Sequence, residues 1–242
     1  MKANRSWTWK IWLSGFAVVF TVLPASALAF MSQTVNQVVP DGDTSGLLSS
    51  AIVSGVPGTV SGLRLSLDLA GSGVEGGFNG DLYAYLRRQE GGFAVLLNRP
   101  GRRPGADAGY GDSGLSVVFD ESAGADIHNY RLTLNGNEGT PLAGGLTGVW
   151  QTDGRFVDPE STANYAGVAR TATLASFDGL SPNGTWDLHI FDLASGGEVK
   201  LQSWGLSFIA VPEPHATAVV SSLGLMVFRL WRHRALGGVR FK

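Results

Sequence analysis

The sequence contains no cysteine, and charged residues make up only 16% of its 242 positions. The lack of cysteine excludes disulfides, thiolate zinc sites and cysteine nucleophiles together. A domain of this size can be stable without disulfides, so their absence does not argue against export. The 34 glycines, together with many Val, Leu, Thr and Ser residues, favour short strands joined by tight turns over a helical bundle.

Basic residues are concentrated at the two ends of the chain. Residues 1–29 hold three bases and no acid, and residues 212–242 hold five bases and one acid, so the middle keeps ten bases and nineteen acids. The middle therefore carries a net charge of about −9. Nucleic-acid phosphates need Lys and Arg, which excludes nucleic acid as a partner of this part.

The N-terminus has the layout of a signal peptide. A basic start is followed by an apolar run, Ile11–Leu23, and then by Pro24. Small residues at Ala27 and Ala29 fit the cleavage pattern of signal peptidase, so we expect export through the Sec translocon and cleavage after Ala29. The alternative is a retained membrane anchor, for which the apolar run is short.

The C-terminal tail has three parts in a fixed order. A rigid segment that can extend neither a strand nor a helix comes first, at Val211, Pro212, Glu213 and Pro214. A mostly apolar run, Ala216–Trp231, then predicts a transmembrane helix about long enough for one thin membrane crossing. Positive charge that would stay on the cytoplasmic side follows at Arg232 and Arg234.

This order of motifs resembles the PEP-CTERM sorting signal of Gram-negative bacteria. The resemblance assigns residues 211–234 to the sorting signal and residues 235–242 to a basic cytoplasmic tail. It implies that an exosortase, a membrane transpeptidase-like enzyme, recognises the tail and removes it as the protein reaches the cell envelope or the exterior. A permanent C-terminal anchor is the alternative, and both place the middle outside the inner membrane.

The middle of the chain has a hydrophobic period of two, which predicts strands with one buried face. A slip at Gln202-Ser203 predicts a β-bulge. Residues 30–210 are therefore expected to form one all-β sandwich or jelly roll. The alternating apolar positions are Leu63, Leu65, Leu67 and Leu69; Leu82, Ala84 and Leu86; Trp186, Leu188 and Ile190; and Leu201, Trp204, Leu206 and Phe208.

Several pieces in this order resemble the P domain, or Homo B domain, that follows the catalytic domain of kexin- and furin-like subtilisin proteases. The resemblance covers residues 38–209 and implies a jelly-roll, galactose-binding-like β-sandwich that stabilises a serine endopeptidase. The chain departs from the family at Gly71–Gly77 and at Asp120-Glu121. The pieces that carry it are Val39–Asp41, Gly58–Leu69, Gly80–Leu86, Val117–Asp120, Leu174–Gly179, Gly184–Leu188, Phe191-Asp192 and Leu201–Leu206.

A protease motif is present without its partners. Gly111-Asp112-Ser113-Gly114 matches the nucleophile loop of chymotrypsin-like enzymes, which need a histidine base before the serine. The only histidines of the middle, His128 and His189, both come later. The signatures around the subtilisin His and Ser are also missing. We therefore expect no catalytic residues and no enzymatic activity.

Acidic residues at strand ends suggest a site for Ca²⁺, which prefers several oxygen ligands. The candidates are Asp68, Asp81, Asp120 and Asp192, and the last three occupy positions that match the P-domain family. The alternative is that they are solvated turn carboxylates.

Aromatic residues that we expect on the surface predict a glycan platform, chiefly Tyr83, Tyr85 and Trp150, with Tyr110 and Tyr165 as further members. Packing against a neighbouring loop is the alternative. The Pro- and Gly-rich segment 98–105, with Arg99, Arg102 and Arg103, predicts a solvated loop.

Three functions are compatible with these features. The first is a non-catalytic β-sandwich delivered to the cell surface for adhesion or extracellular assembly. The second is an accessory domain that docks on a separate subtilisin-like serine protease. The third is a module that binds extracellular polysaccharide.

Overall fold

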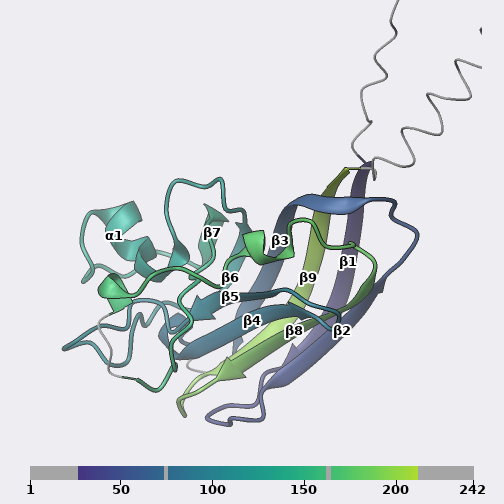
Figure 1. The fold of residues 1–242 in the computed structure, drawn as a ribbon. Helices are drawn as coiled ribbons and strands as arrows, with labels where there is room; N and C mark the ends of the chain where they lie inside the picture. Colours follow the sequence, from purple (N-terminus) through teal and green to yellow (C-terminus); the bar gives the residue numbers. More distant parts are fainter. Residues whose placement is uncertain (1–26, 74–75, 162–164, 212–242) are drawn as a thin grey trace, which may run out of the picture.

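The computed structural model describes residues 27–73, 76–161 and 165–211, and this part of the chain is an all-β fold of two sheets (Figure 1). The first sheet, called sheet A, has the order β1 (Ala27–Val38), β9 (Glu198–Val211), β3 (Thr59–Ser72), β6 (Leu115–Phe119) and β7 (Leu146–Trp150). The second, sheet B, has the order β2 (Leu47–Val53), β8 (Gly184–Asp192), β4 (Leu82–Arg88) and β5 (Phe93–Asn98). All the strand pairs are antiparallel except β6 with β7.

Helical structure in the described residues is confined to short pieces. They are α1 (Tyr130–Asn135) and the single 3₁₀ turns η1 (Asn79–Asp81), η2 (Ile127–Asn129), η3 (Tyr165–Gly167) and η4 (Leu174–Phe177). Gly136 ends α1 in the left-handed region, with a φ of 69°. The Asn135-Gly136 pair therefore ends a helix.

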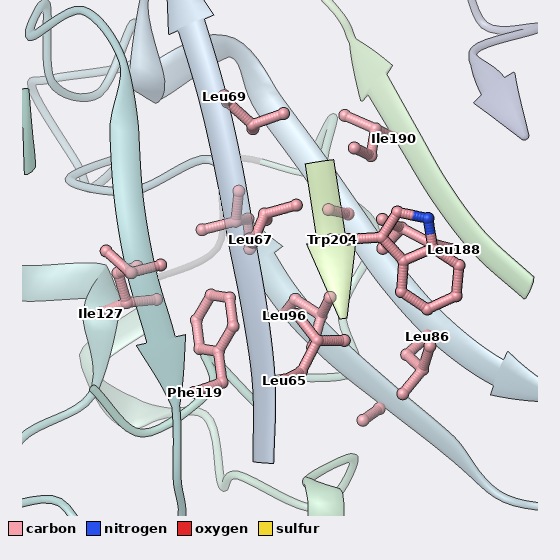
Figure 2. Packing of buried hydrophobic residues seen from close by; sticks show 14 of the residues in the cluster. Leu65, Leu67, Leu69, Leu86, Leu96, Phe119, Ile127, Leu188, Ile190 and Trp204 are labelled. Carbon is pink, nitrogen blue, oxygen red and sulfur yellow. The ribbon is translucent and has the colours of Figure 1, made fainter. Parts of the chain in front are cut away.

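The predicted alternation accounts for the core between the sheets. Leu65, Leu67 and Leu69 of β3 point inward, and Figure 2 shows them packed with Leu86, Leu188 and Ile190 of sheet B. Burial of these side chains is the main stabilising term in such a domain, at about 1.5–3 kcal/mol for each large apolar residue.

Two tryptophans connect the layers. Trp204 of β9 donates its indole N–H to Ser49 Oγ of β2 at 2.9 Å, which is a hydrogen bond between the two sheets. Trp186 of β8 packs against Phe208 of β9 with ring centroids 5.3 Å apart. The core thus fixes how the sheets face each other.

The predicted bulge in β9 is confirmed. Asp68 pairs with Ser203 and Leu69 with Leu201, so Gln202 is the extra residue on β9. The bulge restores the inward direction of Leu201 while Trp204 also points inward, which explains the break in the period of two.

The first and last strands lie side by side, and Ala27 pairs with Ala210. Strand β1 therefore includes residues 27–29, which the sequence assigns to the signal peptide. No helix in the described residues is long and apolar enough to cross a membrane. The expected transmembrane segment and the motif residues Pro212, Glu213, Pro214, Arg232 and Arg234 lie outside the described residues.

Candidate functional site

The structure does not bring the four expected calcium ligands together. Asp68 lies on the solvent side of sheet A, where it is paired with Ser116 and Ser203 in the neighbouring strands. Asp120 is bonded to Arg64 at 2.5 Å and to the Ser122 backbone N–H at 2.9 Å. Those bonds supply Asp120 with partners of its own, and they explain why its pKa is lowered despite partial burial.

Asp81 and Asp192 do lie together. Residue Leu82 at the start of β4 pairs with Asp192 at the end of β8, and the Leu193 N–H donates to the Asp81 carbonyl at 3.0 Å. Asp81 is bonded to Arg99 at 3.2 Å. Within the described residues, no group of three or more His, Asp or Glu side chains is arranged to hold a metal ion as it stands.

The segment 98–105 is solvated only in part: Pro104 and Gly105 are exposed, whereas residues 98–102 are buried, contrary to the prediction for Arg99 and Arg102. Arg99 and Arg102 are each only 6% exposed. Arg99 donates to the Gly80 carbonyl and to Asp81, and Arg102 donates to the carbonyls of Pro159 and Glu160. These guanidinium groups satisfy buried oxygens, a tertiary role that composition alone does not reveal.

Three of the five expected platform aromatics are buried instead. Tyr110 and Tyr165 are each 1% exposed and Trp150 is 5% exposed. The Trp150 indole donates to the Thr147 carbonyl at 2.9 Å. The glycan-platform prediction is therefore wrong for Trp150, Tyr110 and Tyr165.

Tyr83 and Tyr85 belong to a larger group on the outer side of sheet B. The sequence prediction missed the other members because they come from β5, β8 and a loop. Each ring contacts at least one other ring, with centroids 4.7–6.1 Å apart. We call this group the aromatic face, and it consists of Tyr83, Tyr85, Phe93, Phe156, His189 and Phe191.

Tyr85 is the centre of the aromatic face. Its ring stacks on His189 at 4.7 Å with an interplanar angle of 13°, and it contacts Phe93 at 5.2 Å and Tyr83 at 5.9 Å. Phe156 at the border is 70% exposed, whereas the other five rings are half-buried. Burial raises the pKa of Tyr83 to about 12, so the hydroxyl is a neutral hydrogen-bonding group.

His189 lies within this face in surroundings that favour its neutral form. Burial lowers its pKa, and the nearby Arg87 lowers it further. Its Nε2 is buried and has no hydrogen-bond partner among the described residues. Stacking between Tyr85 and Phe191 is therefore its main contact.

A polar cluster borders the aromatic face. Asp187 accepts hydrogen bonds from Ser50 at 2.6 Å, Arg87 at 3.1 Å and Gln89 at 3.2 Å. These bonds hold the pKa of the Asp187 carboxyl below its usual range, although burial opposes the shift. The face therefore has flat rings beside a fixed array of donors and acceptors.

The Gly111–Gly114 motif has a structural role. Asp112 accepts from the Tyr130 hydroxyl and from Arg131, each at 2.7 Å, and from the Leu142 N–H at 2.8 Å. His128 is 2% exposed, and its ring nitrogens lie 2.7 Å from Asp153 and 3.0 Å from the Arg102 carbonyl. Neither nitrogen of His128 is therefore open to accept a proton from Ser113.

No protein-family model matches the chain, and no curated protein matches it. Among solved structures, the chain is similar to the crystal structure of a serine protease of Aeromonas sobria, with 16% sequence identity and a TM-score of 0.41. The similarity covers 79% of this chain and 28% of the protease, so the chain spans less than a third of that protein.

Proposed function

We propose that this chain is an exported, non-catalytic module that binds extracellular polysaccharide through the aromatic face and thereby acts in adhesion or extracellular assembly. The aromatic face carries the proposal. Sugar rings present apolar C–H surfaces that stack on aromatic rings, and their hydroxyls need donors and acceptors close by. The six rings and the cluster around Asp187 offer both chemistries side by side.

The proposed destination rests on the two ends of the sequence. The basic and apolar N-terminus with Ala27 and Ala29 supports export through the Sec translocon and cleavage by signal peptidase. The PEP-CTERM-like tail supports sorting by an exosortase to the envelope or outer surface. For the fold, we propose the jelly-roll class of the P domain, since the pieces that resemble that family supply strands β3, β4, β8 and β9.

Tyr85→Ala provides the test, because this residue contacts four other members of the aromatic face. We expect co-sedimentation of the mature protein with exopolysaccharide isolated from the producing bacterium. Loss of one stacking ring should weaken binding about 3- to 10-fold. Tyr85→Phe keeps the ring and should retain most of the binding.

Phe30→Ala is the matched control, since Phe30 is 71% exposed but lies on β1 of sheet A. It should bind as the unaltered protein does. Equal binding by the Tyr85→Ala variant and the unaltered protein would reject the aromatic face as the binding site. If polysaccharide does not bind, but the chain raises the melting temperature of a subtilisin-like catalytic domain from the same organism, the accessory-domain function takes its place.

A further inference from the structure

The carboxylate of Asp192 is buried in an unusual way. Its residue is 1% exposed, and neither Oδ1 nor Oδ2 has a hydrogen-bond partner among the described residues. The Ala194 backbone N–H exerts a weak favourable effect on the charged form but does not reach hydrogen-bond geometry. A buried carboxylate with no donors is costly, so such a group calls for a specific partner.

Two more carboxylates act on Asp192 through their charge. Asp81 immediately precedes Leu82, the residue that pairs with Asp192, and Asp41 accepts from the Gly196 N–H with both oxygens at 3.2 Å. Both carboxylates act on Asp192 as like charges. The nearby cation, Arg99, is bonded to Asp81 at 3.2 Å and to Glu160 at 3.4 Å, so its donors are directed elsewhere.

The loop that carries Asp41 is held against β8 by close backbone contacts. The Asp43 N–H donates to the Asp192 carbonyl at 3.3 Å. A Cβ on Gly46 would lie 2.5 Å from the Phe191 ring and 2.7 Å from the Ile190 carbonyl. The chain thus keeps Asp41 and Asp192 at one end of sheet B by packing that only glycine permits.

We propose that Asp192, with Asp41 and Asp81, forms a binding site for a hard divalent cation such as Ca²⁺. A cation placed there would use both unpartnered oxygens of Asp192 and would neutralise the repulsion among the three carboxylates. Main-chain carbonyls of the loop that carries Asp41 and of the loop that follows β8, together with water, would complete the oxygen ligands that Ca²⁺ requires. Burial, with the like charges of Asp81 and Asp41, also raises the pKa of Asp192 to about 7.

The test uses the mature full-length protein, freed of metal with EDTA and dialysed at pH 8. We expect saturable binding of about one Ca²⁺ by isothermal titration calorimetry. At a hundredfold excess over Kd, Ca²⁺ should raise the melting temperature by roughly 5–10 °C. NaCl at equal ionic strength should not reproduce this rise.

Asp192→Asn should abolish both the calcium heat and the shift in melting temperature. This variant should also be at least as stable as the metal-free protein at pH 8, since it removes a buried charge, so loss of binding cannot be confused with unfolding. Asp68→Asn, on the opposite sheet, is the control and should keep the full response. Absence of calcium binding by the unaltered protein, or an undiminished response of Asp192→Asn, would overturn the proposal.

A third result distinguishes neutralisation of Asp192 by a bound cation from its neutralisation by protonation. If acid stabilises the metal-free protein but Ca²⁺ at millimolar concentration has no effect at pH 8, Asp192 is accommodated by protonation and the cation site does not exist. This outcome leaves the polysaccharide proposal untouched, because the aromatic face and its variants are tested separately.

Discussion

At the scale of single residues, the buried charged groups of the described chain differ in whether they have ionic partners. The His128, Asp153 and Arg155 cluster is fully paired: Arg155 bonds Asp153 at 3.2 Å and Asp126 at 3.0 Å. Asp192 has no such compensation. Paired buried charges satisfy one another's hydrogen-bonding groups, whereas an unpaired one makes stability depend on pH or on a ligand.

The pH dependence of metal-free protein follows from Asp192. Burial and the like charges of Asp81 and Asp41 raise its pKa to about 7, from a value near 3.8 in an unfolded chain. A raised carboxyl pKa favours folding below the unfolded value and loses that contribution as pH rises through the folded value. The unaltered protein should therefore lose stability relative to Asp192→Asn between about pH 4 and pH 7, by on the order of 2–4 kcal/mol.

Urea unfolding of both proteins at a series of pH values, in EDTA, measures this difference. Arg99 lowers the Asp192 pKa, and this effect is already included in the value of about 7. A difference in the free energy of unfolding that stays constant across the range would show that Asp192 titrates normally.

At the scale of strands and loops, Gly46 links the acidic loop to the aromatic face. Its φ is +60°, and an added Cβ would overlap Phe191. Gly46→Ala should therefore destabilise the protein by about 2–4 kcal/mol, through backbone strain and steric overlap together.

Gly55→Ala is a matched control for Gly46→Ala, since Gly55 has a φ of +75° and nothing within 4 Å of an added Cβ. This variant should show the backbone strain alone, about 1 kcal/mol. Chemical denaturation measures both costs. Equal costs at the two positions would mean that the loop moves away from Phe191 without penalty.

The elements also show how far sequence reasoning reaches. Period-two alternation identified the inward residues of β3, β4, β8 and β9 and the bulge at Gln202, because these patterns are local. It could not place Trp150, since β7 pairs in parallel with β6 and its neighbours give no clear alternation. Asp81 and Asp192 were expected among the calcium ligands, but the nearness of Asp41 to the end of β8 was missed, because it depends on contacts between segments far apart in the sequence.

At the scale of the whole molecule, the proposed processing of the two ends would limit what the mature protein contains. Cleavage after Ala29 would leave β1 starting at Phe30, which still pairs with Ser207 of β9. We expect intact mass spectrometry of the exported protein to show the loss of residues 1–29. In cells with an active exosortase, most of residues 212–242 should be lost as well.

A strain without exosortase is the control for that measurement, and its protein should retain the tail and sediment with membranes. Mature protein that still contains residues 1–26 would show that the N-terminus is an anchor and not a leader. Protein of equal mass in both strains would show that an exosortase does not process the tail.

The position of β9 has a mechanical consequence. This strand ends at Val211, next to the tail, and is hydrogen-bonded on both sides, to β1 and to β3. If the protein is held by its tail while sheet B grips a polymer, tension runs along β9. Its ladder bonds lie across that direction and share the load, so they yield together and not one by one. A domain tethered in this way would resist shear in flowing water.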